Sequence, residues 1–287
     1  MEMRRKIKLL VSLLLIALLF SAVAFPSYAW MRENVRTARI RHNSRMSPII
    51  FIPGSSATQD RFDDLISELN SAQKNHSQLK ITVQEDGTMK TTGKIQQSDS
   101  QPFIVVGFEN NKDGYDNIKK QAVWFNKAMD YLVNKYHFNH FSGIGHSNGG
   151  LIYTLYLEKY FDSDSLTINS LMTIATPFNF SEKNINKRTQ MLADLIDDKA
   201  ALPKNLTMYS IAGTEDYSDD GTVPFQSVEA GKYIYQNQVK HYTEITVTGV
   251  DSSHSDLPQN QQIVQLIEQY ILKDPNNNRN PRNNPSS

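Results

Sequence analysis

The stretch GIGHSNGG, residues 143–150, places a serine between closely spaced glycines. Apolar residues flank it on both sides, which predicts a buried strand before the serine and a helix after it. Residues 145–149 match G-x-S-x-G, a pattern in which glycines permit a strand-to-helix turn too sharp for larger side chains. One interpretation is a tight turn that contains a serine by chance. The other is a nucleophile, Ser147, raised at the start of a helix whose amides favour developing negative charge.

The segments on either side of this turn alternate between short apolar runs and amphipathic stretches of helical period. A chain of this kind predicts a mostly parallel sheet with helices on both faces, in one domain over residues 47–272. An inserted β-hairpin is expected at residues 79–95, because Asp86-Gly87 separates two alternating runs. Residues 179–204 are expected to form a short helical cap, since they leave the carboxyl end of a strand. This segment has an apolar stripe of helical spacing, which consists of Met191, Leu192, Leu195 and Ile196. Two interpretations stay open: the stripe faces an acyl chain in the site, or it packs against the core.

A serine hydroxyl needs a histidine base and a carboxylate to orient that base, in the chain order Ser, acid, His for this architecture. Only His241 and His254 follow the serine. His241 opens a strand, whereas His254 lies in the loop at that strand's carboxyl end, where active-site loops gather. His254 is therefore the predicted base. His146, beside the nucleophile, is expected to pack or hydrogen-bond within the turn.

The acid is expected in the loop TEDYSDDGTVP, which offers Asp216, Asp219 and Asp220. Gly221 permits a sharp turn directly after Asp220 and favours that residue, while the other two stay open. The same loop partly matches a calcium-binding loop, with Asp216 and Asp220 at its first and fifth positions. Ser227 stands at the twelfth position, where such a loop has Glu, so a calcium site is the weaker interpretation.

An acyl-transfer site also needs donors for the oxyanion that forms during the reaction. One is expected from the backbone N–H of Asn148, the residue after the nucleophile. The other is expected from the backbone N–H of Ser55, in the loop IPGSSATQ that follows the first strand. The predicted mechanism requires neither a metal ion nor an organic cofactor.

Taken together, the chain resembles the DUF915 family of α/β hydrolases, lipase-like cell-surface hydrolases of Gram-positive bacteria. The resemblance covers nearly all of residues 48–272 and rests on IIFIPGSSAT, the hairpin, PFIVVGFENN, QAVWFNKAMDYLVNKY, GHSNGG, IATPFN, DGTVP and SSHSDL. It implies an α/β-hydrolase fold with a triad of Ser147, Asp220 and His254. Two positions depart from related lipases: Pro53 stands where His often precedes the oxyanion-loop glycine, and Asn148 replaces the commoner Met or Gln. Neither change removes a backbone donor.

The N-terminus carries a basic segment, an apolar run and a small-x-small site at Ser27-Tyr28-Ala29, with Pro26 expected to end the apolar helix. This order predicts that residues 1–29 are a secretory signal peptide or an uncleaved membrane anchor. Residues 30–46 are rich in arginine and are expected to form a basic linker. Residues 273–287 are rich in Asn and Pro and are expected to be disordered.

Removing residues 1–29 takes four basic and one acidic side chain from 30 of each, which leaves 26 basic and 29 acidic. This balance gives no electrostatic footprint for nucleic acid. The expected protein is secreted or displayed at the cell surface, with membrane or cell-envelope association through its N-terminus. Its expected function is hydrolysis of a small-molecule or lipid carboxylic ester. The alternatives are an amidase or peptidase with the same triad, and a non-catalytic surface binding protein on this fold.

Overall fold

The computed structural model describes residues 2–42, 44–72 and 75–272. The chain falls into two compact units, Met1–Ser44 and Arg45–Ser287. The tail predicted to be disordered, residues 273–287, lies outside the described residues.

The first unit is one helix, α1 (Glu2–His42), with Pro26 in its interior. Residues Met3–Val35 are long and apolar enough to cross a membrane by length and composition, a property that a signal sequence shares. The expectation that Pro26 ends the apolar helix was wrong. Pro26 does not end the helix, because a proline removes one backbone bond and can be accommodated as a local irregularity. Residues 30–42 of the predicted linker are helical, and they contain four arginines, a residue type that favours helices.

The second unit is built on an eight-stranded sheet with the order β3-β2-β4-β1-β5-β6-β7-β8 among its described residues. Every neighbouring pair is parallel except β2 and β3, which form the predicted antiparallel hairpin. The strands are β1 (Ile49–Ile52), β2 (Gln78–Val83), β3 (Met89–Gly93), β4 (Phe103–Phe108), β5 (His140–His146), β6 (Thr167–Ile174), β7 (Thr207–Thr214) and β8 (His241–Thr248).

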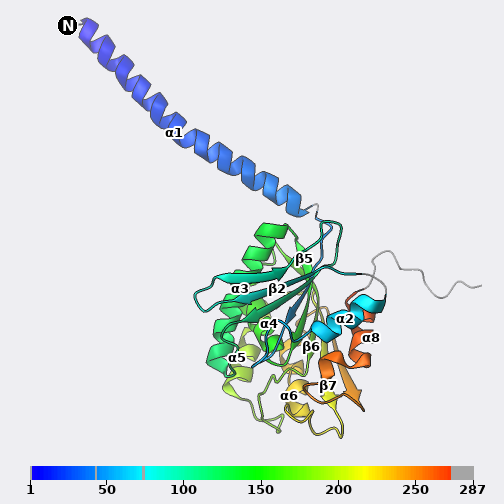
Figure 1. Cartoon of the computed structure of the whole chain (residues 1–287). Coiled ribbons are helices and arrows are strands. Elements are labelled where there is room, and N and C mark those ends of the chain that lie inside the picture. The colour runs from blue at the N-terminus through cyan, green and yellow to red at the C-terminus, as the bar shows by residue number, and fades with distance from the viewer. Residues whose placement is uncertain (1, 43, 73–74, 273–287) are drawn as a thin grey trace, which may run out of the picture. The chain divides into compact units, whose positions relative to one another are not determined.

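Helices cover both faces of this sheet, as Figure 1 shows. Helices α3, α4 and α5 pack on one face, and α2 and α8 pack together on the other. The longer elements are α2 (Asp63–Ala72), α3 (Tyr115–Tyr136), α4 (Asn148–Lys159), α5 (Gln190–Asp198) and α8 (Gln261–Tyr270). The short ones are η1 (Lys199–Ala201), α6 (Phe225–Glu229), α7 (Lys232–Tyr235) and η2 (Leu257–Gln259).

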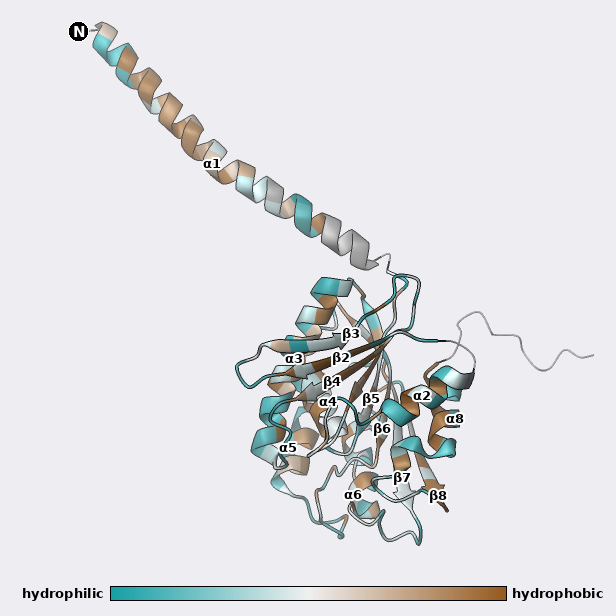
Figure 2. Ribbon diagram, in the orientation of Figure 1, coloured by the Kyte–Doolittle hydropathy of each residue, from teal (hydrophilic) through white to brown (hydrophobic). Residues whose placement is uncertain are grey.

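The sheet divides the apolar interior into two cores. Alternate residues of β1 point to opposite faces, so that Ile50 and Ile52 join the core under α3, α4 and α5, while Ile49 and Phe51 join the core under α2 and α8. All four are essentially inaccessible to solvent. Figure 2 shows the same pattern, with hydrophobic residues along the central strands and hydrophilic residues on the outward sides of the helices. Burial on both faces explains why the central strands read as continuous apolar runs.

One buried carboxyl group has no hydrogen-bond partner among the described residues. Glu158, near the end of α4, is only 8% exposed, and both of its carboxylate oxygens lack a hydrogen-bond partner. Burial, reinforced by the nearby carboxylate of Asp198, raises the pKa of Glu158 to about 9, and Lys159 opposes this only in part. The side chain is therefore protonated at neutral pH.

A glutamate with a raised pKa makes the folded state less stable as the pH rises. Its contribution is fully present below the ordinary value of 4.5 and is lost progressively up to about pH 9. Replacing Glu158 with Gln removes this titration while keeping the shape of the side chain. We expect Glu158→Gln to match the wild type in free energy of unfolding at pH 5 and to exceed it by roughly 1–3 kcal/mol at pH 8. Urea unfolding at the two pH values measures the difference, and a constant difference between them would contradict the prediction.

Candidate active site

The predicted nucleophile lies on a strained turn between β5 and α4. Ser147 has φ 53° and ψ −128°, a backbone conformation that a residue with a side chain rarely adopts. Side chains are excluded next to it: a Cβ at Gly149 would lie 2.1 Å from the Ile52 carbonyl oxygen, and one at Gly145 would lie 2.6 Å from the Gly150 nitrogen. The glycines of the motif are therefore required by close backbone packing.

Two hydrogen bonds fix the strained turn from the next strand. The Ser147 N–H donates to the Ile174 carbonyl at 2.8 Å, at the end of β6. The Thr176 hydroxyl, just beyond that strand, donates to the Ser147 carbonyl oxygen at 3.0 Å. Both polar groups of the Ser147 backbone are thus satisfied on one side, which leaves the side chain as the group presented to the cavity.

The structure brings the three predicted residues together in one hydrogen-bonded chain. Ser147 Oγ lies 3.0 Å from His254 Nε2, and His254 Nδ1 lies 2.7 Å from Asp220 Oδ2. The residues come from the turn after β5, the loop after β7 and the loop after β8, which all end at the same edge of the sheet. Ser147 and Asp220 are buried, at 7% and 3% exposure. His254, with a side chain 13% exposed, separates them.

Asp220, and neither of the other two aspartates of its loop, reaches His254. Its second oxygen, Oδ1, accepts from the backbone N–H groups of Thr222 and Val223, at 3.0 and 2.7 Å. The sharp turn expected after it is present, with φ 85° at Gly221. The Asp220 carbonyl also accepts from the His254 backbone N–H at 2.8 Å. The carboxylate is therefore held in one orientation by the turn that carries it.

The other two aspartates are occupied at the surface. Asp216 accepts from the Ser218 backbone and hydroxyl, and these bonds lower the pKa of its carboxyl group. Asp219 lies 3.6 Å from the Lys183 ammonium. Because the carboxylates of Asp216 and Asp220 point to different partners, they do not converge as a calcium loop requires. Across the described parts of the chain, no group of three or more acidic or histidine side chains is arranged to hold a metal ion.

His146 supports the loop that carries the histidine. Its Nε2 lies 3.0 Å from the His254 carbonyl oxygen, and the two rings are 4.8 Å apart. Burial lowers the pKa of His146 well below its usual value, and the neighbouring His254 and Arg61 lower it further. The imidazole is therefore neutral and donates its Nε2 proton to the carbonyl. A structural role was expected for His146, but this partner, 108 positions away, could not be inferred.

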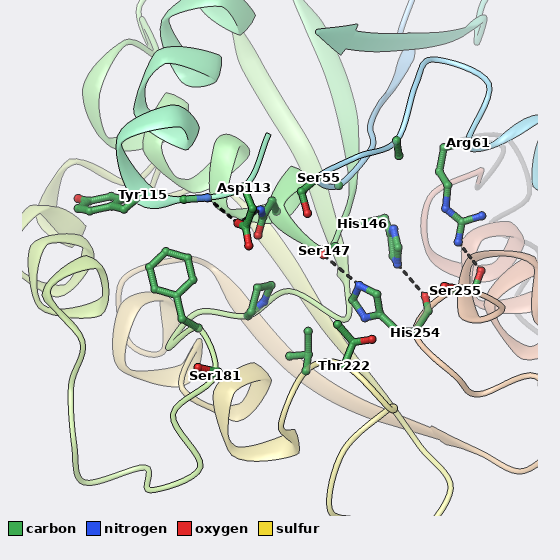
Figure 3. A pocket seen from close by; sticks show the side chains of 17 residues that line it. Ser55, Arg61, Asp113, Tyr115, His146, Ser147, Ser181, Thr222, His254 and Ser255 are labelled. Carbon is green, nitrogen blue, oxygen red and sulfur yellow. Dashed lines mark hydrogen bonds between the residues drawn. The ribbon is translucent and has the colours of Figure 1, made fainter. Parts of the chain in front are cut away.

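Arg61 supports the same loop and was not identified in the sequence. Its guanidinium donates to the Ser255 carbonyl and, at 3.2 Å, to the Gln259 side chain. Burial lowers the pKa of Arg61, while the carboxylates of Asp256 and Asp64 act in the opposite direction. The side chain thus connects the segment after β1 to the residue that follows His254. Figure 3 shows this contact beside the histidine pair.

The two predicted oxyanion donors border the same space as Ser147. Ser55 and Asn148 both line the cavity, and a Cβ at Gly54 would come within 2.6 Å of the Ser147 Cβ. In the described chain, neither the Ser55 nor the Asn148 backbone N–H donates to a protein acceptor. Neither N–H is therefore engaged within the described protein.

The cavity has a volume of about 670 Å³. Its size suits a small or medium ligand. Figure 3 shows the side chains that surround it. The lining residues include backbone and polar groups near Ser147, with an apolar wall made by Ala57, Tyr115, Pro177, Phe180 and Val223.

The segment expected to form a cap meets the cavity only at its start. Phe180 and Ser181 line the cavity, and Asn179 fixes them by accepting from Thr189 and donating to the Lys187 carbonyl. The apolar stripe lies elsewhere: Met191, Leu192 and Leu195 are at most 1% exposed and belong to the core beside α4, and Ile196 packs against that core. The structure therefore supports the interpretation in which this stripe packs against the core and does not face an acyl chain.

The comparisons with known proteins agree with this fold. A solved structure from Lactobacillus plantarum WCFS1, a protein to which the role of a cell surface hydrolase has been assigned, is 57% identical, with a TM-score of 0.74 over 80% of this chain and 92% of that one. The lin2722 product of Listeria innocua is 28% identical, with a TM-score of 0.72 over 80% of this chain and 96% of that one. Comparison with curated proteins gives no match. The model of the DUF915 family, described as alpha/beta hydrolases of unknown function, matches residues 37–274, and the chain belongs to that family.

Proposed function

We propose that the protein is an exported serine hydrolase that cleaves carboxylic esters through an acyl-enzyme intermediate. The observation that carries the proposal is the continuous chain of hydrogen bonds from Ser147 Oγ through His254 to Asp220. Support for export comes from the apolar helix Met3–Val35 and from the similarity to a protein assigned to the cell surface. This apolar helix is also the part of the chain that would associate with the membrane or cell envelope.

In the proposed first half-reaction, Ser147 Oγ attacks the ester carbonyl carbon and its proton passes to His254 Nε2. Asp220 stabilises the resulting imidazolium through the Nδ1–H bond. The Ser55 and Asn148 N–H groups stabilise the oxyanion of the tetrahedral intermediate. The bond to the alkoxy oxygen then breaks, and the alcohol leaves with the proton from His254.

In the second half-reaction, water attacks the carbonyl carbon of the acyl-enzyme. His254 accepts a proton from this water and returns it to Ser147 Oγ as the bond between that oxygen and the acyl carbon breaks. The carboxylic acid leaves and the serine hydroxyl is restored. Because water is the only co-substrate, the atoms and charges of the two half-reactions balance without a cofactor.

The proposal is tested first at the nucleophile. Ser147→Ala removes the attacking oxygen and leaves the turn in place, since alanine keeps the Cβ and the backbone bonds to Ile174 and Thr176. We expect the wild type to react with a fluorophosphonate probe and to hydrolyse p-nitrophenyl esters faster than matched anilides. Both activities should be lost in the variant, while its circular dichroism spectrum stays unchanged. Undiminished ester turnover by Ser147→Ala would overturn the mechanism.

A second test concerns the acid. In Asp220→Asn, the amide oxygen still accepts from the Thr222 and Val223 N–H groups, so the amide nitrogen faces His254 Nδ1. This nitrogen donates a proton, which forces His254 to carry its own proton on Nε2, where it can no longer accept one from Ser147. We expect kcat to fall by up to about ten-thousand-fold with KM little changed.

The neighbouring aspartates provide the matched controls for that measurement. Asp216→Asn and Asp219→Asn remove the same charge from the same loop but touch no part of the hydrogen-bonded chain. Their kcat values should stay within about threefold of the wild type, because charges and ion pairs at the surface contribute little to the stability of the fold. Near-normal turnover by Asp220→Asn, together with a large loss in either control, would place the acid elsewhere in the loop.

A third test concerns Arg61, which acts through the position of His254 and not on the substrate. Arg61→Ala removes the donors to the Ser255 carbonyl and the Gln259 side chain, so the histidine loop is less firmly held. Displacing a catalytic group by about 1 Å can cost on the order of 100-fold. We expect a loss of roughly 10- to 100-fold in kcat, with KM nearly unchanged. Arg61→Lys should restore part of it, because lysine can still donate to Ser255. A change in KM alone would show that Arg61 binds substrate instead.

A further inference from the structure

The cavity around Ser147 contains one carboxylate that no cation neutralises. Asp113, an exposed residue at the mouth of the cavity, lines it from the loop after β4. Its Oδ1 accepts from two neutral donors, the Gly114 N–H and the Asn148 side-chain amide, both at 2.7 Å. Among the described residues, no lysine or arginine lies within ion-pair distance of it; Lys112, which precedes it, is not among the cavity-lining residues.

The position of Asp113 relates it directly to the reacting groups. Asn148, to which it is hydrogen-bonded, follows Ser147 in the chain and is one of the two proposed oxyanion donors. In Figure 3, Asp113 and Tyr115 lie on one side of Ser147, and Arg61 and Ser255 lie on the other. The carboxylate is therefore close to where a substrate carbonyl would be bound.

The one lysine or arginine among the described residues that line the cavity, Arg61, makes its contacts away from Asp113. The Arg61 guanidinium is engaged by the Ser255 carbonyl and the Gln259 side chain, and the carboxylates of Asp256 and Asp64 act on it. The donors of Arg61 are therefore used by the loop that carries His254, on the other side of Ser147 from Asp113. Asp113 is the charged side chain on its own side of Ser147 among the described residues that line the cavity.

Aromatic side chains line the same cavity as this carboxylate. Tyr115 and Phe180 both contribute to the wall, and their rings offer the negative π-faces that attract ammonium groups. The ring of Tyr115 already has an ammonium group over it, that of Lys119 at 4.5 Å from the centroid, and Lys119 is itself paired with Asp116 at 2.7 Å. An ammonium group on a substrate would therefore use the Phe180 ring and the Asp113 carboxylate.

From this arrangement, and resting on the proposed ester hydrolysis, we propose that Asp113 determines specificity for esters that carry an ammonium group. The cation on the substrate supplies the partner that the carboxylate lacks, and the aromatic wall receives its alkyl substituents. Esters with an anionic group near the carbonyl are disfavoured by the same charge. The ammonium group is on either the acyl or the alcohol part of the ester, and the two are distinguished by experiment.

The test compares two esters of equal shape that differ in charge. Butyrylcholine carries a trimethylammonium group, and 3,3-dimethylbutyl butyrate carries a neutral tert-butyl group in its place. A second pair places the same two groups on the acyl part. We expect the full-length wild type to prefer the cationic ester of one pair by about fivefold or more in kcat/KM, and this ratio to fall as ionic strength rises.

Asp113→Asn separates charge from structure. The amide oxygen of asparagine can still accept from Gly114 and Asn148, so only the negative charge is removed. The cationic-to-neutral ratio should fall to about one, and Phe180→Leu should lower it about twofold. Asp164→Asn is the control, since Asp164 is an exposed carboxylate in the loop before β6, at the opposite edge of the sheet. Its ratio should equal that of the wild type.

The outcomes distinguish failure of the cation site from failure of the proposed ester hydrolysis. Turnover of the neutral esters with no cationic preference, or a preference that survives Asp113→Asn, overturns the role of Asp113 and leaves ester hydrolysis intact. Absence of turnover of every ester overturns ester hydrolysis. In that case, calorimetric titration of Ser147→Ala protein with the two esters decides on the cation site, because binding requires no turnover. Equal affinities for the two esters would overturn the site.

Discussion

The sharp turn at Ser147 is the constraint on which the rest of the structure depends. A backbone at φ 53° and ψ −128° is costly, by about 1–3 kcal/mol, and persists only when its surroundings leave no alternative. Here β6 supplies the two hydrogen bonds that hold the turn, and the packing of Gly149 against Ile52 excludes any side chain beside it. The strain is therefore balanced by the sheet itself, and the direction in which the hydroxyl points is a property of the whole fold.

The histidine is held from its backbone as much as from its ring. The His254 N–H is bound to the Asp220 carbonyl, and the His254 carbonyl is bound to the neutral His146 ring. Arg61 holds the next residue, Ser255. The imidazole of His254 therefore keeps its orientation without help from the substrate, which in the proposed mechanism favours proton transfer.

Much of this site could be predicted from the sequence, because some residues carry local patterns and the fold fixes their order. Glycines mark the turn at Ser147, and the loop after a predicted strand marks His254. Arg61 and Asp113 carry no such pattern, since their partners lie 194 and 35 positions away along the chain. The apolar stripe around Leu192 shows a second limit of sequence-based prediction. Its helical period predicts that one face of the helix is buried, but the period does not distinguish burial against the core from burial against a ligand.

The reacting groups are contributed by segments far apart in the chain, with 107 positions between Ser147 and His254 alone. The segment that carries His254 follows β8, the last strand among the described residues. Under the proposed mechanism, Ser147 becomes reactive only when the segment after β8 is in place beside it. Labelling of Ser147 would then report completion of folding as directly as it reports catalysis.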